Sequence, residues 1–308
     1  MDLDIAFNTT IPFLILIGLG FISRKGGLLK EGDERVLMSF VFYFALPSFF
    51  VSNLSQINFT QVNFIFLLAG VIPILIVLVI FSLLRMLFKF SRGTFYLLVL
   101  STVFGNLLFF GIPFMDFAFP GAESLAMLSA ASISILAIPV TMTFLESYNI
   151  QGSDKLESSR RVLKGLSKNP VVVSVLFGII LSVSRITVPV PILNPLNLLG
   201  ATTVPVATFL LGVFFYGRKF RELASGFKLS LLRMALLPTI ALIIATLANL
   251  SRIEVTAIVI MHGTPLAIPM IVFCERYNFY KDKMASLLLI SSLLAGIYLN
   301  VWLLILGY

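Results

Sequence analysis

The stretch VIMHGTPLAIPMIVF, residues 259–273, decides the predicted fold. It is strongly apolar, yet it contains His262, the only histidine of the chain, followed by Gly263, Pro265 and Pro269. A proline inside a helix removes one backbone hydrogen bond and clashes with the preceding turn. If the segment crosses a membrane, the freed backbone groups have no water to bind, so they must face the protein interior or a wet cavity. We therefore expect a broken membrane helix whose break faces a binding site.

The composition places this stretch in an integral membrane protein. Of the 308 residues, 59% are hydrophobic and only 12% are charged, too few charges to cover the apolar surface of a soluble protein. Apolar runs of roughly 20 residues recur along the chain, and each is long enough to cross a bilayer as a helix. The net charge of +8 comes from short loops between these runs, so we expect no nucleic acid partner.

Ten apolar spans are predicted, and the chain is thus expected to be an all-α integral membrane protein. Their approximate limits are 5–22, 36–54, 62–84, 94–115, 124–145, 170–186, 196–216, 229–249, 255–273 and 285–306.

The basic residues orient these spans. Of the 22 Lys and Arg residues, 20 fall in alternate loops on one side, and only Arg185 and Arg252 fall on the other. Basic loops stay in the cytoplasm, so we expect a multi-pass protein of the cell membrane with both termini outside. The loop before span 229–249 is assigned Arg218, Lys219, Arg221, Lys228 and Arg233, and no charged residue is expected deep inside a span.

A polar segment, residues 148–168, divides the chain into two sets of five spans. An odd number of spans in each half makes the second half insert upside down relative to the first, which predicts an inverted repeat. The expected organisation is a first repeat over 1–145, a cytoplasmic linker over 146–169 and a second repeat over 170–308.

The fourth and ninth spans correspond in this repeat. Aligning Pro113 with Pro269 places Asn106 on His262, each seven residues before its proline. Two broken helices at matching positions of an inverted repeat indicate a transporter binding site near the middle of the membrane. The free N–H groups of half-helix N-termini suit an anion, so a small carboxylate is the expected ligand.

Individual side chains can be assigned to this site. By helical spacing, Thr102, Asn106 and Pro113 share one face, and the Asn106 amide could donate to a carboxylate. His262 could donate to the anion or carry a coupled proton; the alternative is a packing histidine held by a hydrogen bond. The candidate binding residues are Thr102, Asn106, Gly111, Ile112, Pro113, His262, Gly263, Thr264, Pro265 and Pro269.

No catalytic or metal centre is expected. One histidine and one cysteine, Cys274, cannot form a His/Cys metal cluster, and no serine has a plausible base and orienting carboxylate. We expect no cofactor beyond a coupled proton or sodium ion, and an integral membrane enzyme is the least favoured alternative.

Five segments resemble the auxin efflux carrier family. NLLFFGIPF resembles the Asn-x-x-x-x-Gly-Ile-Pro segment of the plant carriers, and LAIPMIVFCERYN resembles their broken ninth helix. FYFALPSFF, NPVVVSVLFG and VPVATFLLG resemble the second, sixth and seventh helices. The resemblance covers nearly the whole chain, although the long cytoplasmic loop of many plant members is absent and the family rarely has histidine at position 262.

The resemblance implies ten helices in two inverted five-helix repeats, a fold shared with bile acid symporters and sodium/proton antiporters. Helices four and nine would cross at Pro113 and Pro269, and Asn106 would contact the substrate. Helices 1, 2, 6 and 7 would form a scaffold, through which two copies would form a homodimer. The other helices would form a mobile transport domain that carries malonate, malate or a similar acid by an elevator movement.

The expected function is therefore secondary transport of a small organic anion across the lipid bilayer. A membrane receptor or sensor that binds a similar anion without moving it is the alternative.

Overall fold

The computed structural model describes the whole chain except residues 1–2, 57–62, 150–159, 161–163, 165–166 and 218–219. Every regular element in the described part is a helix, as predicted, and the only β-type pairing there is one isolated bridge. Six helical runs within these residues are long and apolar enough to cross a membrane: Asp33–Leu54, Phe64–Phe88, Glu123–Tyr148, Val190–Phe215, Leu223–Leu247 and Lys281–Ile305.

These six runs fall on the predicted spans two, three, five, seven, eight and ten. The first span lies on α1 (Leu3–Lys25), and the sixth lies on the shorter α9 (Pro170–Val183). Spans four and nine are each divided into two helical parts by a short non-helical segment. The count of ten membrane helices and their inverted repeat stay predictions.

The chain divides into two compact units, and each unit contains segments from both halves of the sequence. Unit 1 contains α4 (Phe64–Phe88), α5 (Arg92–Val103), η3 (Leu107–Gly111), α6 (Ile112–Ala118), α7 (Glu123–Asn149), α12 (Leu223–Leu247), α13 (Arg252–Gly263), α14 (Pro269–Arg276) and α15 (Lys281–Ile305). Unit 2 contains most of α1 together with α2 (Asp33–Phe40), η1 (Val41–Ala45), α3 (Leu46–Leu54), α9, α10 (Val190–Ala201) and α11 (Thr203–Phe215).

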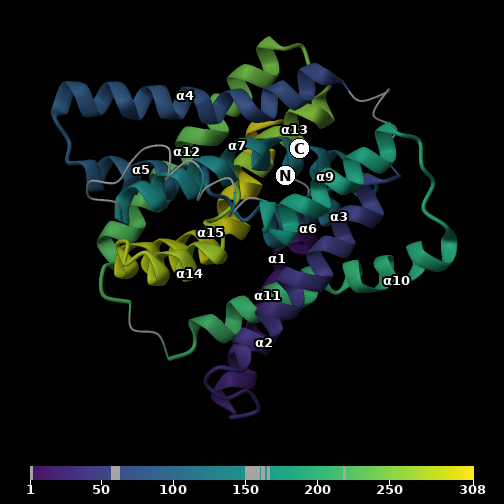
Figure 1. The fold of residues 1–308 in the computed structure, drawn as a ribbon. Helices are drawn as coiled ribbons and strands as arrows, with labels where there is room; N and C mark the ends of the chain where they lie inside the picture. The colour runs from purple at the N-terminus through teal and green to yellow at the C-terminus, as the bar shows by residue number, and fades with distance from the viewer. Residues whose placement is uncertain (1–2, 57–62, 150–159, 161–163, 165–166, 218–219) are drawn as a thin grey trace. The chain divides into compact units, whose positions relative to one another are not determined.

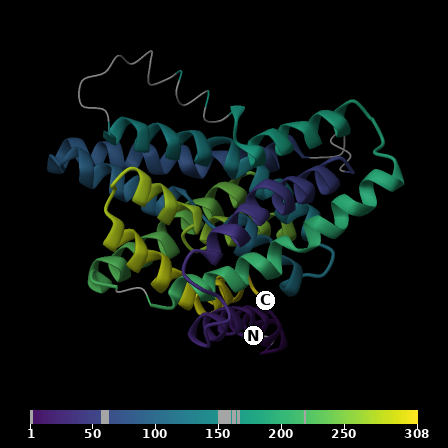
Figure 2. The same cartoon turned by 60° about the horizontal axis from the view of Figure 1, so that its bottom comes forward.

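Helix α12 is the central element of unit 1. It packs against α15, α13, α4 and α5, and its green ribbon lies beside the yellow α15 in Figures 1 and 2. The contact with α15 is close because Gly226 has no side chain: a Cβ there would lie 2.7 Å from Cβ of Ser286. Helices α5 and α13, which α12 also contacts, are the first parts of the two interrupted spans.

In unit 2, α3 packs against α9 and α10, as Figure 1 shows. Helices α1 and α11 approach until their backbones touch. A Cβ added to Gly20 would overlap the carbonyl oxygen of Phe209, and one added to Gly212 would overlap that of Ile17. Small residues allow such close approach in membrane helix pairs, where apolar surface area alone gives no advantage over lipid.

Replacing Gly20 by alanine is expected to destabilise the protein by about 1–3 kcal/mol, the usual cost of overpacking. The obstacle is main chain of α11, which cannot rotate away. Gly18 on the same helix is the matched control, because a Cβ there meets nothing within 4 Å. Thermal unfolding of the purified variants measures the difference, and equal midpoints for Gly18→Ala and Gly20→Ala would contradict the α1–α11 packing.

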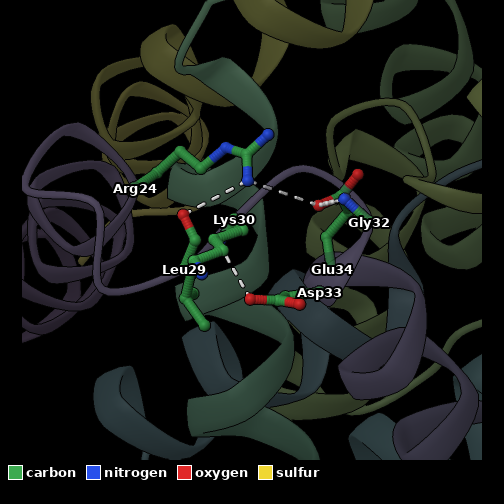
Figure 3. A network of polar contacts seen from close by, with 6 residues as sticks. All are labelled: Arg24, Leu29, Lys30, Gly32, Asp33 and Glu34. Atoms are coloured by element: carbon green, nitrogen blue, oxygen red, sulfur yellow. Dashed lines mark hydrogen bonds and ion pairs between the residues drawn. The ribbon is translucent and has the colours of Figure 1, made fainter.

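The turn between α1 and α2 is held by local polar contacts (Figure 3). Nη1 of Arg24 donates to the carbonyl oxygen of Leu29 at 3.2 Å and lies 4.0 Å from the Glu34 carboxylate. The same carboxylate accepts from the backbone N–H of Gly32 at 3.0 Å. Ion pairs of this partly exposed kind contribute at most about 1 kcal/mol, so we assign them to the turn and not to a binding site.

Candidate functional site

The first interruption lies between α5 and η3. Helix α5 ends at Val103, and Asn106 begins the next helix with the backbone angles φ −82° and ψ 62°. Its side-chain Oδ1 accepts a hydrogen bond from the backbone N–H of Phe109 at 3.3 Å, which makes Asn106 the N-cap of η3. Pro113 stands where the π-helical η3 passes into α6 (Ile112–Ala118), within one continuous helical run.

The second interruption lies between α13 and α14. Helix α13 ends at Gly263, and Thr264 is extended, with ψ 150°. The Thr264 hydroxyl donates back to the carbonyl oxygen of Met261 at 2.9 Å. Pro269 begins α14, since proline is preorganised for the first helical position. The sequence predicted a broken helix here, and the structure has one.

The two interruptions pair with each other inside unit 1. The backbone N–H of Asn106 donates to the carbonyl oxygen of Pro265 at 2.7 Å, and that of Ala267 donates to Phe104 at 3.1 Å. Gly105 and Leu266 form the antiparallel bridge between these bonds. We call residues 104–106 and 264–268 the helix crossing. Main-chain groups freed by the breaks are thus partly satisfied by each other, as a buried position requires.

Glycine allows the crossing to close. A Cβ on Gly111 would lie 2.7 Å from Sδ of Met261 and 2.7 Å from Cγ2 of Thr264, both well below contact distance. A Cβ on Gly105 would lie 2.6 Å from the Thr264 hydroxyl and would also collide with Nη2 of Arg233. The missing side chain of Gly111 therefore lets η3 reach the end of α13.

Arg233 corrects the expectation that no charged residue lies deep inside a span. It was assigned to a cytoplasmic loop, but it lies within α12 and only 1% of it is exposed. Its Nε donates to the carbonyl oxygen of Thr264 at 2.7 Å, and Nη1 donates to those of Ser101 at 3.2 Å and Thr102 at 2.5 Å. The side chain thus reaches both interrupted helices, and it is the functional candidate that the sequence analysis missed.

One proposed helical face is also wrong. Thr102, Asn106 and Pro113 were placed on one side of a continuous helix, but the helix ends at Val103 and resumes at Leu107. The break changes the direction of the chain between Thr102 and Asn106. The Thr102 hydroxyl is buried and has no hydrogen-bond partner among the described residues. Thr102 still belongs to the site, because its carbonyl oxygen accepts from Arg233.

His262 lies in the last turn of α13 with 2% of it exposed. Its Nε2 is 3.0 Å from the carbonyl oxygen of Gly70 on α4. A carbonyl oxygen can only accept, so Nε2 carries the proton and donates. This bond joins α13 to α4 and occupies the ring nitrogen Nε2. A role of His262 toward a ligand stays a prediction.

The structure thus brings most of the predicted residues to one place. Thr264 and Pro265 lie on one side of the crossing and Asn106 on the other, while Gly111, Pro113 and Pro269 lie in the adjoining helices. Two further candidates are tightly surrounded by other side chains. Ile112 is 2% exposed, and a Cβ on Gly263 would lie 3.0 Å from Leu299.

Comparison with known proteins shows the family of this chain. The profile of a family described as membrane transport protein matches residues 5–303. The chain belongs to this family, that of the auxin efflux carriers. An uncharacterized transporter of Methanocaldococcus jannaschii is 25% identical over 97% of this chain and 98% of its own length. The lysosomal cholesterol signaling protein of Mus musculus is 24% identical over 99% of this chain, which spans 38% of that protein.

The chain is therefore a multi-pass membrane transporter and not an enzyme. The recognition of the family from five short segments is confirmed by the profile match.

Proposed function

We propose that this transporter moves a small organic anion, a malonate- or malate-like carboxylate, and binds it at the helix crossing. The observation that carries the proposal is Arg233. It is a fully buried cation on α12, and no Asp or Glu of the described residues forms an ion pair with it. The carbonyl oxygens that accept from Arg233 carry only partial negative charge, so an anionic ligand beside the guanidinium would balance its full positive charge.

Asn106 supplies the second element of the proposed site. Its Oδ1 is used in capping η3, so the Nδ2 amino group is the part of the side chain left for a ligand. Nδ2 is a donor only, which suits a carboxylate oxygen. The N-termini of η3 and α14 add partial positive charge on the same two segments. Both sources favour an anion over a metal ion.

We further propose that the anion crosses by an elevator-type movement in which unit 1 carries the crossing and unit 2 serves as scaffold. Two observations support this: all groups of the crossing belong to one compact unit, and each unit combines segments from both halves of the chain. A homodimer through unit 2 is part of the same proposal.

Uptake into proteoliposomes tests the function. Labelled malonate, malate and indole-3-acetate are supplied separately, with and without imposed proton or sodium gradients. The proposal expects saturable uptake of at least one acid, reduced by an excess of the same unlabelled acid. The absence of uptake of every acid by folded, reconstituted protein would contradict it.

A second candidate, a sensor that binds an anion without moving it, is favoured by the name of the mouse relative, a signaling protein. The same experiment separates the two. Saturable binding to the purified protein, together with no flux into liposomes, would support the sensor.

His262 gives a prediction about coupling. His262→Gln keeps a donor for the Gly70 carbonyl oxygen but cannot bind and release a proton near neutral pH. If His262 carries a coupled proton, this variant should retain uptake driven by the anion gradient and lose the response to an imposed proton gradient. His262→Ala is the control for the lost contact with α4. Equal proton responses of the parent and His262→Gln would leave the imidazole with a packing role only.

A further inference from the structure

Arg233 uses its guanidinium in an unusual way. The hydrogen bonds recorded for it all end on main-chain carbonyl oxygens: those of Ser101, Thr102 and Thr264. Most buried guanidinium groups pair with a carboxylate. This one therefore neutralises backbone dipoles, and the origin of those dipoles indicates its role.

The three oxygens belong to the ends of two helices. Ser101 and Thr102 lie in the last turn of α5, and Thr264 directly follows the last residue of α13. The final carbonyls of a helix have no partner within it and carry the negative end of the helix dipole. Two such ends meet at the crossing, and their carbonyl oxygens create a local negative potential at the position of the Arg233 guanidinium.

Converging carbonyl oxygens are also the ligands that hard cations prefer. In transporters with broken helices, the C-terminal ends of half-helices and unwound carbonyls coordinate the coupling cation. Here a side chain of the protein already binds these oxygens. The guanidinium keeps its charge at neutral pH and is tethered, so it cannot leave with the substrate at the end of a transport cycle.

We infer that the Arg233 guanidinium permanently occupies the position that a coupling metal cation would take at the crossing, so that this transporter works without sodium or lithium ions. The expectation of sodium-independent uptake rests on the proposed function. The expectation that cations stabilise only a protein without the guanidinium does not. It makes Arg233 the residue that decides ion coupling. Removing the guanidinium would expose the carbonyl oxygens to cations from solution.

The first readout is thermal unfolding of purified protein in sodium, lithium, potassium or choline chloride at equal ionic strength. The parent should unfold at one temperature in all four salts. Arg233→Ala should unfold at a lower temperature in choline and regain part of the loss with sodium, lithium or millimolar methylguanidinium. Lys228→Ala, at an exposed position of the same helix, is the matched control and should respond to none of them.

The second readout is uptake. The parent should transport its acid equally well in sodium and in choline. Arg233→Ala should lose roughly tenfold or more in choline, and methylguanidinium should restore part of that loss. Should Arg233→Ala fail to fold, Arg233→Lys replaces it: its ammonium keeps the charge, so it should fold and stay indifferent to sodium.

Sodium-dependent stability or uptake of the parent would overturn the inference, because a cation site would then exist beside Arg233. The inference would also be overturned if Arg233→Ala folds and its unfolding temperature is the same with every cation. Sodium-dependent unfolding or uptake of Arg233→Lys would overturn it as well. A parent that transports no acid would contradict the proposed function instead. The unfolding measurements would still test whether the Arg233 guanidinium occupies a cation site.

Discussion

Replacing Asn106 by aspartate should abolish most transport while retaining the helix cap. Asp caps a helix as well as Asn does, so the bond from the Phe109 N–H to the side chain is retained. The Nδ2 donor is replaced by a carboxylate oxygen that repels an anion. Losing a hydrogen bond to a charged group costs about 1.5–3 kcal/mol, and repulsion adds to this, so uptake should fall by about 100-fold.

Asn106→Ala separates the two roles of the residue. It loses the cap as well as the donor, so it should lose uptake and also about 1 kcal/mol of stability. Uptake by initial rates and stability by thermal unfolding are measured on the same preparations. If Asn106→Asp transports like the parent, the residue is a helix cap and the proposed binding role is wrong.

The second large effect is expected at Gly111. A Cβ there would lie 2.7 Å from Cγ2 of Thr264, a stiff β-branched side chain, so Gly111→Ala must push η3 away from α13. Overpacking of this kind costs about 2 kcal/mol, and uptake should fall strongly because the crossing no longer closes. Thermal unfolding and initial uptake rates measure the two effects.

A double-mutant cycle tests whether this contact is the cause. Thr264→Ser removes Cγ2 and retains the hydroxyl that donates to Met261. The pair Gly111→Ala and Thr264→Ser should therefore be more stable than the two single changes predict, by at least about 0.5 kcal/mol. Strictly additive effects would mean that Gly111 and Thr264 do not meet as the structure places them.

The sequence predicted the helical class, the membrane family and the two broken helices, because these depend on local features. Apolar runs of sufficient length give membrane helices, and Pro113 and Pro269 restrict the backbone wherever they stand. The exact position of the first break could not be predicted, because Gly105 and Asn106 interrupt helices only weakly. That error placed Thr102 and Asn106 on one face.

Arg233 shows why the site could not be predicted completely. Four residues from the start of the predicted span 229–249, it looked like the last basic residue of a cytoplasmic loop. Its function depends on carbonyl oxygens that precede and follow it by 132 and 31 positions, and no local pattern reports such contacts. A signal was nevertheless present: Leu231 and Leu232 before it and Met234 after it make it an arginine within an apolar run.

Thiol protection at the crossing tests the central claim most directly. Phe104 is partly exposed and adjoins Gly105, and its interaction with Ala267 is through the backbone, so Phe104→Cys should preserve the crossing. The native cysteine, Cys274, is buried and outside any disulfide, and Cys274→Ala removes it from the background. Lys228→Cys, at an exposed position of α12, serves as the control.

The measured quantity is the rate at which a small thiol reagent modifies position 104, with and without a saturating concentration of the transported acid. An anion bound at the crossing should slow modification at position 104 and leave it unchanged at position 228. Equal rates at position 104 with and without an acid that the same variant transports would show that the substrate binds elsewhere.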